Sequence, residues 1–162
     1  MKRIFLVLAL AAMTACGDAV QKDLINYYNT DLPKVTTLEM EAMTAYEGVA
    51  GPNYQGDSIM YMTISQTVIP KYSEFYDKLQ AIKPSTPEIQ KMHGEYVEAA
   101  KDQLEAFKLI ISAIEKQDPE VIKVANGDFE KAQIALDEWR NEFEALKKAH
   151  NVVIEPDSVS SK

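Results

Sequence analysis

Residues 119–150, PEVIKVANGDFEKAQIALDEWRNEFEALKKAH, have the most regular apolar pattern in the chain and decide its fold class. Apolar residues recur there at alternating steps of three and four positions, which places their side chains on one face of an α-helix. Asp118, Pro119 and Glu120 supply an N-cap, a preferred first residue and a charge that suits the helix dipole. The stretch predicts a long amphipathic helix that buries Ile122, Ala125, Phe129, Ala132, Leu136, Trp139, Phe143 and Leu146, with His150 at its end.

The preceding segment, from Pro87 to about Gln117, has the same spacing. Thr86 stands at the N-cap position and Pro87 at the first helical position, and the connection back to residue 82 is short. Short connections favour helices that lie antiparallel to each other. This second predicted helix has a stripe formed by Ile89, His93, Tyr96, Ala100, Gln103, Phe107, Ile110 and Ile114.

Two further amphipathic segments precede these helices, and each contains one internal proline. The first runs from Ala19 to Val49 and contains Pro33. The second begins with Asp57 as its expected N-cap and contains Pro70. Proline removes a backbone donor and collides with the preceding turn, so each segment should bend or restart near its proline. The predicted buried stripes are Leu24, Tyr28, Leu32, Val35, Leu38, Ala42, Tyr46 and Val49, and then Tyr61, Ser65, Val68, Tyr72, Phe75, Leu79 and Ile82.

Four amphipathic helices with short connections predict an all-α fold. The expected architecture is an antiparallel up-down-up-down four-helix bundle in which proline kinks the first and second helices. Residues 16–150 would form this bundle as one domain, and residues 151–162 would form a C-terminal tail.

The N-terminus has the features of an export signal. Lys2 and Arg3 precede an apolar run, residues 4–12, that is too short to span a bilayer but has the length of a signal-peptide core. Residues 13–17, Met-Thr-Ala-Cys-Gly, follow directly. We therefore expect residues 1–15 to be a signal peptide.

Residues 13–17 resemble the lipobox of bacterial lipoproteins, in which a bulky apolar residue and two small residues precede a cysteine that receives a lipid. The resemblance implies that Cys16 is the lipidated residue, although Met13 stands where leucine is usual. Ordinary secretory cleavage after Ala15 would instead leave a free thiol, but it would place bulky Met13 poorly. Cys16 is also the single cysteine of the chain, so no internal disulfide is possible. Past the lipobox, the chain resembles poorly characterised helical-bundle lipoproteins of the cell envelope.

The chain is acidic, with a formal net charge of −8 from 17 basic and 25 acidic residues. Removing residues 1–15 takes away two basic residues, which leaves 15 basic and 25 acidic residues and a charge of −10. This charge disfavours nucleic acids and anionic lipid surfaces as partners. Attachment to the membrane would therefore depend on the lipid, and cationic or neutral partners are favoured.

The motifs of common enzymes are not found in the sequence. It contains no glycine-rich phosphate loop, nucleophile elbow or paired zinc-binding histidines, and neither histidine has the glutamate three positions earlier that a di-iron bundle needs. The sequence accordingly predicts a protein that is not an enzyme and that needs no cofactor.

His93, Met92 and Tyr96 are the strongest candidates for contact with a ligand or metal, because a histidine on an apolar stripe can be a ligand. The competing interpretation is a partly buried histidine that is hydrogen-bonded to a tyrosine, a backbone carbonyl or water. The sequence also leaves open three weaker sets of residues. These are a haem or copper site among Met40, Met43, Met60, Met62 and Met92, a surface cluster of Tyr27, Tyr54 and Tyr76, and a cation site among Glu39, Asp57, Glu95, Glu98 and Glu105.

Taken together, these features predict a non-enzymatic, lipid-anchored binding or interaction module of the bacterial cell envelope. It would lie at the extracytoplasmic face of the cell membrane, attached through Cys16, with an envelope protein or a wall component as its partner. The alternative is a bundle that carries a small ligand, haem or a metal ion outside the cytoplasm.

Overall fold

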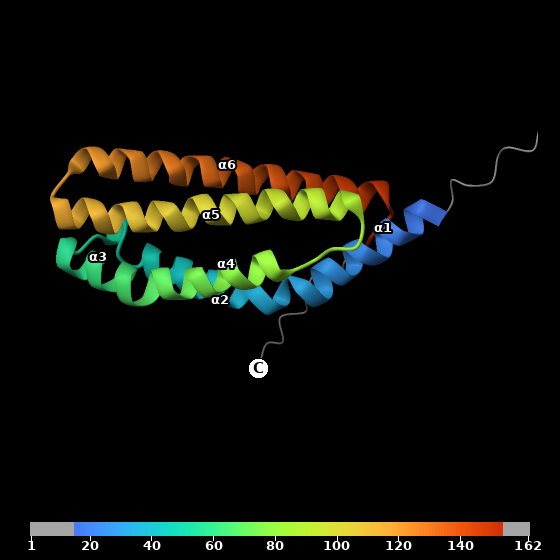
Figure 1. The fold of residues 1–162 in the computed structure, drawn as a ribbon, viewed down its shortest axis with the longest axis horizontal. Coiled ribbons are helices and arrows are strands. Elements are labelled where there is room, and N and C mark those ends of the chain that lie inside the picture. Colours follow the sequence, from blue (N-terminus) through green and yellow to red (C-terminus); the bar gives the residue numbers. More distant parts are fainter. Residues whose placement is uncertain (1–14, 154–162) are drawn as a thin grey trace, which may run out of the picture.

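The computed structural model describes residues 15–153, with side chains from residue 19 onward. Between those limits the chain forms helices joined by short connections and contains no β-strand. The helices lie lengthwise beside one another (Figure 1). The predicted all-α class is confirmed, whereas the predicted signal peptide, apart from Ala15, and residues 154–162 of the predicted tail lie outside the described residues.

The two C-terminal helices are long and uninterrupted. Helix α5 spans Pro87–Lys116, helix α6 spans Pro119–Ala149, and they lie side by side in opposite directions (Figure 1). Gln117 adopts a left-handed conformation, φ 54°, at the turn between them. The Asp118 side chain caps α6 by accepting the Glu120 amide at 3.0 Å, as predicted.

We call a run of consecutive helical segments along one line a rod. The first rod consists of α1 at Ala15–Asn26, the π-helical turn η1 at Tyr27–Asp31, and α2 at Pro33–Glu47. The Leu32 amide donates to the Tyr27 carbonyl, five residues back, at 2.9 Å. A wider turn before Pro33 makes room for the proline ring and for its missing N–H group. The interruption predicted at Pro33 is therefore a local π-turn.

The second rod is built in the same way, from α3 at Asp57–Thr63, the π-helical turn η3 at Ile64–Val68, and α4 at Ile69–Ala81. The Ile69 amide donates to the Ile64 carbonyl. Pro70 comes two residues after the end of this turn, so a π-helical turn precedes both internal prolines.

Near these wider turns the buried residues differ from the predicted stripes, although beyond each turn Val35 and Tyr72 are buried as predicted. Tyr27 is fully buried, whereas the predicted Tyr28 is only partly buried. Ile64 is likewise buried in place of the predicted Tyr61 and Ser65. The 3.6-residue period that underlies the prediction does not hold through a π-turn, which explains both errors.

The connection between the rods contains the short 3-10 helix η2 at Gly51–Asn53. Gly56 has φ 115°, a conformation that favours glycine, and it takes the N-cap position of α3. The predicted N-cap Asp57 is instead the first residue of α3, and its carboxylate accepts the Tyr54 hydroxyl at 2.5 Å. The prediction of the N-cap was therefore wrong by one residue, because the backbone turn is made by glycine.

Asp23 of α1 joins the first rod to the start of α5. Its buried Oδ2 atom accepts the Ser85 amide at 2.9 Å, the Thr86 amide at 2.7 Å and the Thr86 hydroxyl at 2.7 Å. The Thr86 side chain therefore does not cap α5 as predicted, although Thr86 occupies the N-cap position. The α4–α5 connection is held by a carboxylate from another helix.

Replacing Asp23 with alanine should lower the free energy of unfolding by about 2 kcal/mol, because two partly buried amide donors lose their acceptor. Chemical denaturation followed by circular dichroism would measure this change. Asp23→Asn, which keeps one side-chain oxygen, should lose less. Equal stability of the wild-type protein and Asp23→Ala would show that water replaces the carboxylate without cost.

The C-terminal end of α6 returns to α1. The Gln21 amide donates to the His150 carbonyl at 2.9 Å, and Val152 is buried in the common core. Residues 151–153 of the predicted tail are thus described, and one of them packs into the fold. Between residues 15 and 153, no helix combines the length and the apolar content needed to cross a bilayer.

Candidate functional site: a groove between α2 and α6

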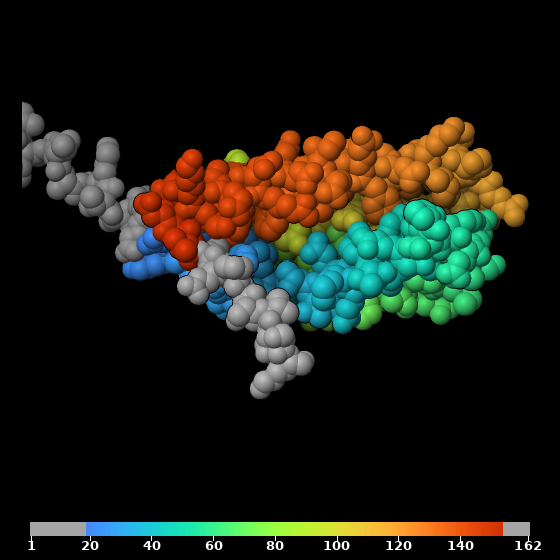
Figure 2. Space-filling view, turned by 180° about the vertical axis from the view of Figure 1, so that it is seen from behind, coloured from blue at the N-terminus to red at the C-terminus, as the bar shows by residue number. Residues whose placement is uncertain are grey.

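The packing of the rods leaves one side of the molecule open. Among the described elements, α2 packs closely on α4, α4 on α5, and α5 on α6, whereas α2 and α6 approach each other mainly through side chains. A groove of about 460 Å³ lies along this open side, and Figure 2 shows it between α6 and α2 with atoms of α5 at its floor. Its lining residues are Thr36, Thr37, Glu39, Met40, Met43, Glu47, Gln103, Gln133, Leu136 and Arg140.

Two stacked aromatic pairs join the helices on either side of the groove. Tyr28 stacks on Phe143 with ring centroids 5.6 Å apart, and Tyr46 stacks on Phe129 at 5.3 Å. The α6 residues that line the groove lie between these pairs in the sequence. One pair thus joins η1 to α6 and the other joins α2 to α6, and smaller and polar side chains line the space between the two pairs.

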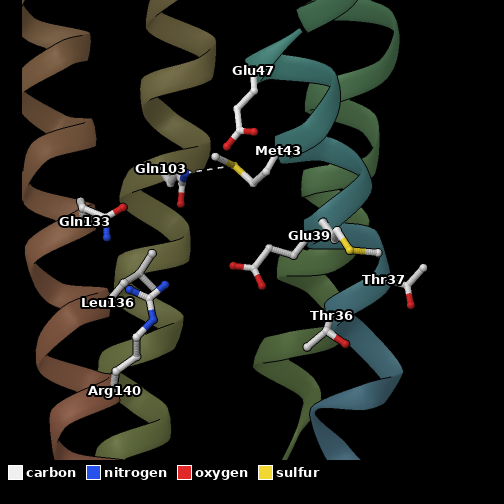
Figure 3. Close-up of a pocket in the computed structure, with 10 residues that line it drawn as sticks. Thr36, Thr37, Glu39, Met43, Glu47, Gln103, Gln133, Leu136 and Arg140 are labelled. Atoms are coloured by element: carbon white, nitrogen blue, oxygen red, sulfur yellow. Dashed lines mark hydrogen bonds between the residues drawn. The ribbon is translucent and has the colours of Figure 1, made fainter. Parts of the chain in front are cut away.

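The floor of the groove is polar and internally hydrogen-bonded. The Gln103 side chain accepts the buried Tyr72 hydroxyl at 2.9 Å. It also donates to the Met43 sulfur at 3.1 Å, a bond drawn in Figure 3. Gln103 is buried although it lies on the apolar stripe of α5. These bonds fix the amide of Gln103, so the floor is a preformed surface.

Glu39 is the principal charged group of the groove and points into it from α2 (Figure 3). Its Oε2 atom accepts the hydroxyl of buried Tyr96 at 2.7 Å. Burial raises the pKa of the Glu39 carboxyl above its ordinary value, and the bond from Tyr96 and the attraction of Arg140 oppose this effect only in part. Tyr96 stacks on Trp139 with centroids 4.5 Å apart, which holds its ring in place.

Glu39 makes no ion pair with any described side chain. Arg140 also lines the groove, but its guanidinium is paired with Asp137 on the same helix at 2.6 Å. Arg140 therefore has a salt-bridge partner on its own helix, whereas Glu39 has none and is only attracted by Arg140 from α6.

Replacing Glu39 with glutamine should stabilise the protein at pH 7, by about 0.5–2 kcal/mol, the range expected when a destabilised functional position is relaxed. Glutamine keeps an acceptor for Tyr96 and avoids the cost of burying a charge. Because the folded-state pKa of Glu39 is raised, its stabilising contribution is present below the unfolded value of 4.5 and is lost as the pH rises through the folded pKa.

The advantage of Glu39→Gln should therefore grow from pH 4 to pH 7, which urea denaturation at a series of pH values would measure. Glu41→Gln, a substitution two residues away on the same helix, should show no such gain, since Glu41 pairs with Lys71 at 2.5 Å. A loss of stability in Glu39→Gln at pH 7 would contradict this account of the carboxylate.

His93, Met92 and Tyr96 lie on α5 but are not brought together at one ligand site. His93 is 6% exposed, and its Nδ1 atom is 3.0 Å from the Tyr27 hydroxyl, so the predicted alternative of a histidine bonded to a tyrosine is confirmed. Burial lowers the pKa of His93, and the nearby Leu79 backbone opposes this. Met92 is fully buried in the core, and Tyr96 bonds Glu39.

The predicted cation site among five carboxylates is not assembled. Glu39 lies in the groove, whereas Glu95, Glu98 and Glu105 pair with lysines on their own helix, and Asp57 bonds Tyr54. Among residues 15–153, no three His, Cys, Asp or Glu side chains form a group that could hold a metal ion.

The other two predicted sets are also dispersed. Of the five methionines, Met40 and Met43 line the groove, Met62 is exposed, Met60 is partly buried and Met92 is in the core. Of the three tyrosines, only Tyr54 is exposed, at 50%, while Tyr76 is partly buried and Tyr27 is fully buried. The prediction of a surface tyrosine cluster is therefore wrong. Tyr27 is buried because the π-turn before Pro33 changes the helical register there.

Sequence reasoning singled out Glu39 but missed Arg140, Gln133 and the groove itself. One signal was available, because Gln103, like His93, interrupts a mainly apolar stripe and a buried polar side chain at such a position needs a hydrogen-bond partner. Comparisons of the chain with protein-family models, with curated proteins and with solved structures give no match.

Proposed function

We propose that this chain is a non-enzymatic, lipid-anchored binding module of the bacterial cell envelope, and that the groove between α2 and α6 is its binding surface. The observation that supports this most is the open side of the fold, where a preformed polar floor and a carboxylate without a salt bridge lie between two aromatic pairs. The partner would be an envelope protein or a wall component, and nucleic acid is disfavoured by the acidic charge.

We further propose that the architecture is the up-down-up-down four-helix bundle expected from the sequence. Its four rods would be residues 15–47, 57–81, 87–116 and 119–149. In this arrangement the groove is the seam between the first and the fourth rod, the one pair of neighbours not joined by a short connection.

Attachment through a lipid on Cys16 would place the groove clear of the membrane. The backbone of Cys16 belongs to the first turn of α1, so no linker would separate the lipid from the fold. Glu39 is 23 residues further along the same rod, which corresponds to roughly 35 Å at 1.5 Å per residue. If the long axis of the bundle is perpendicular to the membrane, the groove would thus lie away from the lipid surface, where partners can reach it.

The composition of the groove supports binding rather than catalysis. It has one acidic side chain at its centre, hydroxyls and amides along its walls, and neither histidine nor cysteine among its lining residues. A nucleophile paired with a base, which acyl transfer needs, is not formed by these groups. The alternative function, a bundle that carries a small ligand, is favoured by the volume of the groove, which falls in the usual range for such ligands.

A photo-crosslinking residue at Thr37 in the lipidated protein, expressed in cells, tests the proposed surface. We expect one cross-linked product of defined mass, which should be absent when the residue is placed at Glu98 on exposed α5 surface. Gln133→Trp, which fills the groove, should abolish the product, and Lys131→Trp on the same helix should not. A product that survives Gln133→Trp would place the binding surface elsewhere.

A further inference from the structure

We infer that the groove recognises a primary ammonium group on an alkyl chain, with the Glu39 carboxylate as the group that binds the cation. The inference rests on the proposed function, because it assigns the chemistry of the ligand to the same groove. Three features of the described residues lead to it: the hydrogen bonding of Glu39, the apolar side chains around it, and the local pairing of Arg140.

The hydrogen bonding of Glu39 leaves one side of its carboxylate available. Tyr96 donates to Oε2 from the buried side of the groove at 2.7 Å, whereas Oε1 has no hydrogen bond to a described residue. Burial removes water from this carboxylate, and the hydrogen bond from Tyr96 and the attraction of Arg140 offset that cost only in part. A ligand ammonium bound at Oε1 would supply the missing charge and a charge-assisted hydrogen bond.

The side chains beside Glu39 suit a hydrocarbon stem. Met40, Met43 and Leu136 line the same groove, and Met40 is 63% exposed at its edge. Thioether side chains adapt to the shape of an alkyl chain. Methylene groups next to the ammonium can therefore leave water on these residues while the charge reaches Glu39.

The electrostatics of the groove favour a cation over an anion. Arg140, the basic residue of the lining, is already held by Asp137 at 2.6 Å, so an anion would have to compete with that carboxylate. Glu39 and Glu47 line the groove, and neither forms a salt bridge with a described residue, although Arg140 attracts Glu39 from α6. The net charge of −10 after residue 15 also attracts cations to the whole surface.

The test compares three small probes of equal chain length on the full lipidated protein in nanodiscs: n-butylammonium, 1-butanol and butyrate. Binding is followed by NMR of labelled methionine methyl groups, in which Met40 and Met43 report on the groove and buried Met92 is the internal control. We expect n-butylammonium to shift the groove signals with an affinity at least about tenfold above that of butanol, the difference made by one charge-assisted hydrogen bond. Butyrate should be the weakest probe.

Glu39→Gln should reduce the affinity for n-butylammonium about tenfold, to that of butanol, and Glu41→Gln should leave it unchanged. The first variant keeps the acceptor for Tyr96, so its fold should persist, and unchanged Met92 signals would verify this. Equal affinity for the three probes, or an unchanged affinity in Glu39→Gln, would overturn the inference.

Two further probes distinguish a free amine from a side chain as the source of the ammonium group. A lysine residue capped at both ends should bind better than the same residue acetylated at Nε, and tighter binding than n-butylammonium would identify a peptide as the source. Failure of every ammonium probe, combined with a cross-link at Thr37 that Gln133→Trp abolishes, would refute the ammonium but leave the proposed function standing. Failure of both experiments would refute both.

Discussion

Replacing Cys16 with alanine is expected to abolish membrane attachment of the protein. We proposed Cys16 as the acceptor of the lipid because residues 13–17 resemble a lipobox, and the acidic chain offers no polybasic segment that could hold it at an anionic membrane instead. Each buried methylene of an acyl chain contributes about 0.8 kcal/mol, and two chains give stable anchoring where one does not. Loss of the lipid should therefore move essentially all of the protein from the membrane fraction to the soluble fraction.

Membrane fractionation and labelling with radioactive palmitate would measure this change. Met13→Leu, which brings the motif closer to the usual lipobox, is the matched control and should remain labelled and membrane-bound. The mass of the N-terminal peptide should equal that of residues 16 onward plus lipid. A wild-type protein that is cleaved after Ala15 and carries a free thiol would contradict the lipid anchor, although the groove would be unaffected.

Replacing Phe107 with alanine is expected to produce the largest loss of stability, about 3–5 kcal/mol, the usual cost of removing a buried phenylalanine side chain. Phe107 on α5 is fully buried and contacts rings of three other helices. Its centroid lies 5.1 Å from Tyr46, 5.2 Å from Tyr72 and 5.1 Å from Phe129. Such a loss is a large part of the 5–15 kcal/mol that stabilises a typical domain.

Denaturation followed by circular dichroism and by the fluorescence of Trp139 would measure the effect. Ile134→Ala, at a 53% exposed position on α6, is the control and should change the free energy of unfolding by less than about 0.5 kcal/mol. Because Tyr46 and Phe129 form one of the stacked pairs beside the groove, the Phe107 variant should also widen it. A loss below 1 kcal/mol would mean that the surrounding rings collapse into the cavity.

The candidate site could be predicted only in part from the sequence. Glu39 was one of several candidate carboxylates, and the sequence already shows that it lacks the lysine three or four positions away that Glu95 and Glu105 have. What the sequence does not show is its bond to the hydroxyl of Tyr96, a residue 57 positions away. Charge partners on the same helix follow from steps of three or four residues, but those across helices depend on which faces meet.

Local rules alone determined the helices themselves. The steps of three and four residues in 87–116 and 119–149, the cap at Asp118 and the interruptions at Pro33 and Pro70 all act over a few residues, so the sequence is enough to predict them. The tertiary structure decided the register around both π-turns, the hydrogen bonds by which Asp23 holds the α4–α5 connection, and the open side between α2 and α6. These features depend on residues distant in the sequence, because hydrogen bonds between helices and the size of facing side chains are settled only when the rods pack together.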